Sequence, residues 1–308
     1  MTSDLAIDVH GLTKRFGTKV AVDHIDIAVP QGEVWGFLGP NGSGKTTTIR
    51  MLCGLLRAND GEGTVLGHDF RTESEAIKRQ VGYMTQKFSF WEDLSIRENL
   101  EFVARLYGLP NVRQAVDQTL ERLGLVKRQN QLAGALSGGW KQRLALAACM
   151  LHQPKMLLLD EPTAGVDPKA RRDFWDEIHR LSAEGLTVLV STHYMDEAER
   201  CDRIVYINLG HVMARGTVAE VIAQSGLVTF VLEGKGARAL AAKLHGQPGV
   251  EFVAFFGAAL HVSGKDKAAL TRALAPYRDQ PGLNIREAPP SLEDVFIQLQ
   301  ERGTGEYA

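Results

Sequence analysis

VWGFLGPNGSGKT, residues 34–46, is the stretch that decides the fold, because it joins an apolar run to a glycine-rich turn and then to the start of a helical pattern. Its second half, Gly39–Thr46, fits the pattern G-x-x-x-x-G-K-[ST] of a phosphate-binding loop. Glycines let successive backbone N–H groups converge on phosphate oxygens, and the helix N-terminus adds the positive end of its dipole. We therefore expect Lys45 to reach the β- and γ-phosphates of a nucleotide and the Thr46 hydroxyl to bind Mg²⁺. The alternative, an ordinary glycine turn, is disfavoured by the predicted strand before the loop and the helix after it.

Outward from this loop, predicted strands and helices alternate. Continuous apolar runs at Met156–Leu159 and Thr187–Ser191 are typical of buried parallel strands. Shorter alternating runs at Ala6–Val9 and Ile25–Val29 predict antiparallel strands near the N-terminus. Residues about 87–153 contain little strand signal and predict a helical insert. The fold class is therefore α/β, a mixed sheet with an antiparallel β subdomain and a helical insert.

Two carboxylates, Asp160 and Glu161, end the first of the buried runs. The carboxyl end of a parallel strand is where α/β sheets bind ligands. We expect Asp160 to hold Mg²⁺ and Glu161 to polarise an attacking water. The alternative is a helix cap or a solvated loop, but Pro162 follows at once and Asp167 already caps the next helix.

A second glycine motif, Ser137-Gly138-Gly139, opens the last helix of the insert. A serine and two glycines at a helix start form an anion-binding surface. Taken alone, the motif is merely a capped helix.

Together these motifs resemble the nucleotide-binding subunit of an ATP-binding cassette (ABC) transporter, and they stand in that family's order over about residues 4–225. Gly39–Thr46 matches the Walker A loop, and Leu157–Glu161 matches Walker B. Ser137-Gly138-Gly139 matches the signature, and residues 164–167 match the D-loop. The remaining matches are Gln86 for the Q-loop and His193 for the switch histidine.

The resemblance implies a role for each matched residue. His193 would contact the γ-phosphate, and Gln86 would sense Mg²⁺ and the water; Phe16 would stack on adenine, with a core aromatic as the alternative. The implied catalytic residues are Glu161, His193, Gln86 and Lys45, and the implied Mg²⁺ ligands are Thr46, Gln86 and Asp160. The implied ATP-contacting residues are Phe16, Gly39, Pro40, Asn41, Gly42, Ser43, Gly44, Lys45, Thr46, Thr47, Ser137, Gly138 and Gly139.

Two departures from the family pattern are Trp140, where glutamine is most common, and AGVD in the D-loop. Neither removes a phosphate ligand. Both, together with PSLEDVF at residues 290–296, resemble the ABC-2-type exporter ATPases, which include multidrug, lipid and glycan exporters.

The chain of 308 residues is long enough for about two folding units. We expect the cassette to cover residues 1–225. Residues 226–308 read β-α-β-β-α-β, the pattern of a ferredoxin-like accessory domain. Ser291 and Asp294 form a helix-start pattern in it.

The composition of the chain limits the classes of partner that we expect for it. The net charge of 35 − 37 = −2 argues against a nucleic-acid partner. No apolar run approaches the roughly 18 residues of a membrane-spanning helix, so if the protein serves a membrane process, we expect a separate permease to cross the bilayer. The spacing of the three cysteines fits neither a disulfide framework nor a zinc site, so we expect them to be buried, reduced thiols.

These observations predict the ATP-hydrolysing, energy-coupling subunit of an ABC-2-type exporter, bound through its permease to the cytoplasmic face of the cell membrane. With one Walker A and one signature, two copies of this cassette, or a copy and a homologous cassette, must face each other head to tail. The alternatives are a soluble ABC ATPase of DNA repair or translation and an importer ATPase. The first usually carries coiled-coil inserts or two cassettes, and the second a β-barrel tail.

Overall fold

The parallel strands predicted around the glycine-rich loop form one six-stranded sheet in the computed structural model, which describes residues 5–306 and side chains as far as residue 300. The strand order is β10-β9-β3-β8-β7-β6. The bounds are β3 (Val34–Leu38), β6 (Val81–Met84), β7 (Met156–Asp160), β8 (Thr187–Thr192), β9 (Arg203–Asn208) and β10 (His211–Gly216). The pairs β3–β8, β3–β9, β7–β8 and β6–β7 are parallel. Strands β3, β7 and β8 are buried along their whole length, which explains their near-continuous apolar sequences.

This strand order brings the predicted motifs together. Because β3, β8, β7 and β6 are parallel neighbours, their carboxyl ends meet at one edge of the sheet. The glycine-rich loop follows β3, and His193 follows β8. Asp160 ends β7 and Glu161 follows it, and Gln86 follows β6. The carboxyl edge of this sheet is therefore the expected ligand site.

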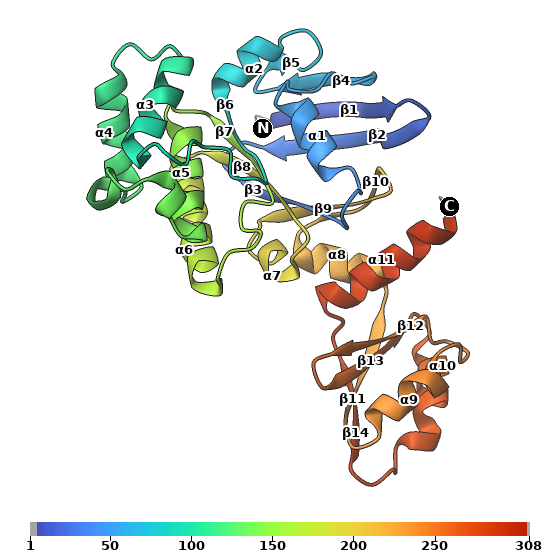
Figure 1. The fold of residues 1–308 in the computed structure, drawn as a ribbon. Coiled ribbons are helices and arrows are strands. Elements are labelled where there is room, and N and C mark those ends of the chain that lie inside the picture. Colours follow the sequence, from blue (N-terminus) through green and yellow to red (C-terminus); the bar gives the residue numbers. More distant parts are fainter. Residues whose placement is uncertain (1–4, 307–308) are drawn as a thin grey trace. The chain divides into compact units, whose positions relative to one another are not determined.

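A second, antiparallel sheet has the order β2-β1-β4-β5. It consists of β1 (Leu5–Phe16), β2 (Lys19–Pro30), β4 (Asp60–Val65) and β5 (His68–Asp69), so its first two strands are longer than the predicted runs. Helix α1 (Lys45–Leu52) packs on both β2 and β7, and one apolar core joins the two sheets (Figure 1). The helix behind the phosphate loop is thus fixed from two sides. Helix α2 (Ser74–Gln80) leads into β6.

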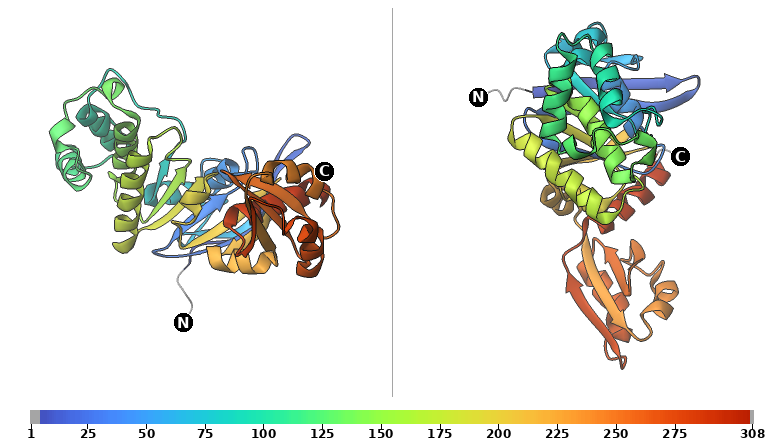
Figure 2. Two further views of the ribbon diagram at one scale, coloured as in Figure 1. Left: turned by 90° about the horizontal axis from the view of Figure 1, so that it is seen from below. Right: turned by 60° about the vertical axis from the view of Figure 1, so that its left-hand side comes forward.

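The insert is helical, as predicted, with α3 (Ile96–Leu106), α4 (Val112–Arg122) and α5 (Gly138–Met150), and two short 3₁₀ turns lie between α4 and α5. These helices gather at one end of the cassette, away from β1 and β2 (Figure 2). The capping box of Ser95 and Glu98 is present at the start of α3. The amide of Asn99, fully buried, donates to the carbonyls of Trp91, Leu94 and Ser95, so the loop before α3 is held in a defined conformation.

Two further helices flank the site. Asp167 caps α6 (Pro168–Ala183) by accepting from the N–H groups of Lys169 and Ala170, as its sequence position predicts. The short α7 (Met195–Ala198) begins two residues after His193. The three cysteines are buried and free, as expected.

The chain divides into two compact units, Met1–Val212 and Met213–Ala308. The sequence predicts a boundary between residues 225 and 226, whereas this division falls earlier, inside β10. Helix α8 (Val218–Ser225) belongs to the second unit because it packs against α11 (Leu292–Glu306).

The second unit has the predicted β-α-β-β-α-β order. Its antiparallel sheet, β12-β13-β11-β14, has the strand order of a ferredoxin-like module. The elements are β11 (Val228–Gly234), α9 (Ala237–Leu244), β12 (Phe252–Phe256), β13 (Ala259–Gly264), α10 (Lys267–Leu274) and β14 (Leu283–Ala288). Helices α9 and α10 share a core with this sheet, and α11 starts at the expected Ser291–Asp294 cap.

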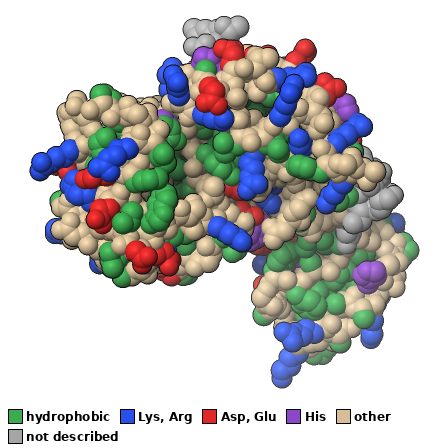
Figure 3. Space-filling view, turned by 45° about the horizontal axis from the view of Figure 1, so that its top comes forward, with side chains coloured by type: hydrophobic (Ala, Val, Ile, Leu, Met, Phe, Trp, Pro, Cys, Tyr) green, Lys and Arg blue, Asp and Glu red, His purple; other side chains and the backbone are tan. Residues whose placement is uncertain are grey.

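Among the described residues, no helix combines the length and the apolar composition needed to cross a membrane. On the face in Figure 3, acidic and basic side chains are interspersed.

Candidate functional site

The glycine-rich loop has a conformation that its glycines are needed to form. Gly39 has φ +149°, and a Cβ atom there would lie 2.0 Å from the carbonyl oxygen of Ile207. A Cβ atom on Gly44, at φ +110°, would lie 2.6 Å from the carbonyl oxygen of Ala21. Ser43 Oγ is buried in the loop with no hydrogen-bond partner among the described residues. The loop therefore has the tight backbone and the available hydroxyl donor of a phosphate cradle.

Lys45 lies beneath the loop and is only 4% exposed. Its Nζ donates to the carbonyl oxygens of Gly39, at 2.7 Å, and Pro40, at 3.0 Å. Burial lowers the pKa of Lys45, and the carboxylates of Glu161 and Asp160 offset part of that effect. A phosphate group would add negative charge beside this buried ammonium.

The Asp160 side chain connects β7 to α1 and to β8. Its Oδ1 accepts from Thr46 Oγ1 at 2.9 Å and from Ser191 Oγ at 2.7 Å. A carboxylate beside a hydroxyl offers the hard oxygen donors that Mg²⁺ prefers. Thr46 and Asp160 thus fit the predicted Mg²⁺ role.

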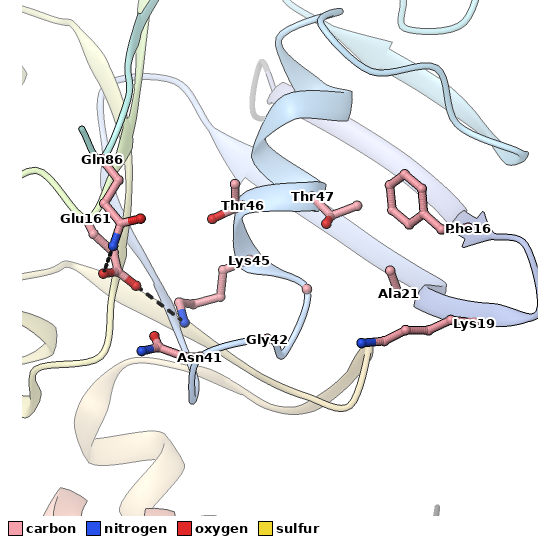
Figure 4. Close-up of a pocket in the computed structure, with 11 residues that line it drawn as sticks. Phe16, Lys19, Ala21, Asn41, Gly42, Lys45, Thr46, Thr47, Gln86 and Glu161 are labelled. Carbon is pink, nitrogen blue, oxygen red and sulfur yellow. Dashed lines mark hydrogen bonds and ion pairs between the residues drawn. The ribbon is translucent and has the colours of Figure 1, made fainter. Parts of the chain in front are cut away.

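Glu161 is the centre of the site. It is 9% exposed and has φ +47°, a left-handed conformation that is unusual for a residue with a side chain. Its carboxylate accepts from Gln86 Nε2 at 2.8 Å and lies 3.9 Å from Lys45 Nζ (Figure 4). It also lies 3.4 Å from His193 Nδ1. Residues from three separate segments therefore converge on one carboxylate.

A cavity of about 430 Å³ opens along the loop and the first turn of α1 (Figure 4). Phe16 lines its far end and is 51% exposed, so it is not a core aromatic. Lys14 Nζ lies 5.1 Å from the centre of its ring. The complete lining is Phe16, Lys19, Ala21, Asn41, Gly42, Gly44, Lys45, Thr46, Thr47, Gln86 and Glu161.

Sequence reasoning missed Lys19 and Ala21 in this lining, and Ser191 behind it. Lys19 and Ala21 lie on β2, which reaches the loop only through the packing of the two sheets. Ser191 directly precedes the matched Thr-His pair at the end of β8, and that position was the available signal.

The signature residues lie in a different hollow. Ser137, Gly139 and Trp140 line a cavity of about 300 Å³ with residues of α6, and this cavity shares no residue with the first. Ser137 is exposed and makes no side-chain capping bond to α5, so its hydroxyl faces outward. Within one chain, Ser137, Gly138 and Gly139 are therefore not brought together with Lys45.

Trp140, the unusual residue after the signature, contacts two arginines. The guanidinium carbons of Arg128 and Arg143 lie 4.5 Å and 5.4 Å from its ring centre. These are cation–π distances. The indole thus links the turn before the signature to α5.

Comparisons with known proteins agree with this geometry. A family model described as "ABC transporter" matches residues 22–164. The chain is 35% identical to Nod factor export ATP-binding protein I of Rhizobium sp. (strain N33), over 97% of this chain and 98% of that protein. It is 36% identical to daunorubicin resistance ATP-binding protein DrrA3 of Streptomyces coeruleorubidus, over 96% of each.

A further relative is the probable multidrug ABC transporter ATP-binding protein YbhF of Escherichia coli (strain K12). The two are 45% identical over 224 residues, which are 72% of this chain and 39% of that protein. The chain therefore spans less than half of the length of this relative.

Solved structures show the same cassette fold. A structure titled as the ATP binding subunit of an ABC transporter superposes with a TM-score of 0.64 at 28% identity, covering 72% of this chain and 93% of that one. The cbiO1 subunit of Clostridium perfringens, described as part of the ABC transporter complex cbiONQ, gives a TM-score of 0.66 at 26% identity. That match covers 78% of this chain and 96% of the other.

Proposed function

Because the chain belongs to the ABC transporter family, we propose that it is the ATP-hydrolysing, energy-coupling subunit of an ABC-2-type exporter. One observation carries the ATPase assignment: the Glu161 carboxylate contacts Lys45, Gln86 and His193 at the carboxyl edge of the parallel sheet. A base, a phosphate-binding cation and two polar sensors within contact distance are what phosphoryl transfer to water requires.

The substrate is ATP. The loop amides and Lys45 hold its phosphates, and Phe16 stacks on the adenine with its exposed ring. Thr46, Asp160 and Gln86 would hold Mg²⁺, which would supply positive charge to offset the negative charge of the phosphates. Glu161 takes the proton of the attacking water, and His193 contacts the γ-phosphate.

A second cassette completes the site. Ser137–Gly139 face outward in a hollow separate from the ATP cavity, which supports the proposal that they bind the γ-phosphate of a partner copy. Two copies, or one copy and a homologous cassette, then enclose two ATP molecules head to tail.

The proposed membrane partner is a separate ABC-2-type permease. The loop before α3 presents Trp91, which is 50% exposed and packs its ring on Phe102 at 4.3 Å. Phe88 and Phe90, whose rings are 5.2 Å apart, extend this apolar surface directly after Gln86. A permease bound here would place the protein at the cytoplasmic face of the cell membrane and would couple to the site through Gln86.

Export is favoured over import and over a DNA-repair or translation role by the relatives. Two relatives that span nearly the whole chain are named for Nod factor export and daunorubicin resistance. The proposed cargo is accordingly a drug-like, lipid or glycan molecule. Copurification with a six-helix permease, followed by ATP-driven uptake into inverted vesicles, tests this proposal; uptake in the opposite direction would indicate an importer.

Glu161→Gln separates ATP binding from hydrolysis. The amide keeps the shape but cannot take the proton of water, so turnover should fall by about 10²-fold or more while ATP binding is retained. Lys45→Ala should instead weaken ATP binding. Turnover and binding of a fluorescent ATP analogue, measured on both variants, check this; near-normal turnover of Glu161→Gln would remove Glu161 from the base role.

A further inference from the structure

A buried carboxylate outside the predicted site, that of Glu197 on α7, joins the segments that carry Glu161 and His193. Glu197 is 1% exposed. Its Oε2 accepts from Thr192 Oγ1 at 2.6 Å, and its Oε1 accepts from Thr163 Oγ1. Thr192 directly precedes His193, and Thr163 follows Glu161 by two residues. One side chain therefore links two neighbouring loops at the edge of the sheet.

The turn at Glu161 needs such support. Its left-handed φ of +47° is a conformation that persists only where the surroundings fix it. On the upstream side, the Glu161 N–H donates to the carbonyl oxygen and Oγ of Ser191. On the downstream side, the hydroxyl of Thr163 is held by Glu197. The direction of the Glu161 carboxylate thus depends on anchors at both ends of the turn.

The charge of Glu197 is balanced from α6. Arg171 Nε lies 3.5 Å from Glu197 Oε1, and Arg171 also lies 4.5 Å from the ring centre of Tyr194. The Tyr194 ring is 4.1 Å from the ring of His193. Since a buried carboxylate is costly unless it is paired and hydrogen-bonded, this set of contacts holds Glu197 in one position.

We propose that Glu197 is a positioning residue, which sets the Glu161 carboxylate and the His193 ring relative to one another and so controls the rate of hydrolysis. Glu197 is not among the residues that line the cavity, so we expect it to act on turnover and to leave ATP binding unchanged. The inference rests on the roles proposed above for Glu161 and His193.

The first test is Glu197→Gln. The amide has the same shape, but its nitrogen cannot accept from a threonine hydroxyl, and it removes the charge facing Arg171. We expect kcat to fall by about 10- to 100-fold, because small displacements of reacting groups have effects of that size. The KM for ATP and the Kd for a fluorescent ATP analogue should stay within about twofold of wild type.

The matched control is Asp196→Asn. Asp196 is on the same helix and lies 3.4 Å from Arg171, but its side chain is 65% exposed. This variant should keep the wild-type kcat. A fall equal to that of Glu197→Gln would assign the effect to Arg171 and overturn the proposal.

A second pair of variants, both at Thr163, leaves the buried charge of Glu197 in place. Thr163→Val removes the hydroxyl that Glu197 holds, and Thr163→Ser keeps it. We expect the first to lower kcat at constant KM and the second to keep most of the activity, even if Glu197→Gln fails to fold.

The outcomes separate this inference from the proposed function. Normal turnover of Glu161→Gln would contradict the function proposed for the site. Loss of turnover in Glu161→Gln together with normal kcat in Thr163→Val and in any folded Glu197→Gln would overturn the positioning role alone. Parallel losses of kcat and ATP binding would show a merely structural effect and would also overturn it.

Discussion

Single residues in this protein serve either the phosphate chemistry or the structure that supports the phosphate site. Trp140 belongs to the supporting structure, because its ring contacts the guanidinium groups of Arg128 and Arg143; it also lines the hollow that holds Ser137 and Gly139. Glutamine is the common family residue at this position, yet glutamine offers no ring to either guanidinium. The departure from the family pattern therefore has a structural explanation.

Trp140→Gln should keep ATPase turnover within a few-fold of wild type if, as we propose, the phosphate contacts come from Ser137 and backbone N–H groups. Losing two cation–π contacts should lower the free energy of unfolding by about 1 kcal/mol. Denaturant unfolding and steady-state ATPase assays measure the two effects, with Trp140→Phe as the ring-keeping control. A loss of turnover comparable to that of Glu161→Gln would show that the indole itself supports the composite site.

At the scale of elements, the junction of α5 and α6 positions the signature. A Cβ atom on Gly139 would lie 2.6 Å from the Cβ of Ala170 on α6. Glycine at this position therefore reflects the close approach of two helices, in addition to any phosphate contact. The start of α5, where Ser137 lies, is set by that approach.

Gly139→Ala should push the start of α5 away from α6 and so displace Ser137. We expect turnover to fall by about tenfold or more, because misplaced reacting groups have effects of this size. ATP binding to the separate Walker A cavity should not change. Adding Ala170→Gly, which removes the opposing Cβ, should restore turnover at a cost of about 1 kcal/mol in helix stability. No rescue in the double variant would mean that the space next to Gly139 is needed by the partner's nucleotide.

At the scale of the whole molecule, the second unit has its own sheet and core. Its described residues contain no cluster of three potential metal ligands. Its last helix is tied to the sheet by buried Asp294, whose carboxylate accepts from Ser291 and contacts His261 Nδ1 at 2.9 Å. We propose a regulatory or tethering role for this self-contained unit.

Truncation after Gly216 keeps β10 and removes α8 together with α11, the helix on which it packs. The shortened protein should still bind and hydrolyse ATP, because no residue of the ATP site lies beyond this point. Its nucleotide-free dimer should be weaker than that of the full chain, since a tether raises the effective concentration of the second copy.

Sedimentation velocity without nucleotide measures the dimer fraction of both proteins. Equal fractions would contradict the tethering role. Loss of ATPase in a folded truncation would show that the second unit is part of the active protein.

The sequence by itself determined the local features of the structure, those that depend on residues close to one another in the chain. The Gly39–Thr46 loop, the capping box at Ser95 and the Asp167 cap are local conformations, which a few adjacent residues encode through backbone freedom and short-range hydrogen bonds. The buried runs at β7 and β8 could be predicted for the same reason, because burial on both faces makes a strand continuously apolar. The family resemblance then supplied the roles of Gln86 and His193.

Only the tertiary structure decided which of these segments touch. Strand order and register pair Asp160 with Ser191 and bring Gln86 to Glu161 across 75 residues of sequence. The bond between Glu197 and Thr163, the ion pair between Glu197 and Arg171 and the packing of α8 on α11 have no local signal. Each depends on side chains far apart in the sequence that meet when apolar faces are buried together, and periodicity in one segment carries no information about its partner in another.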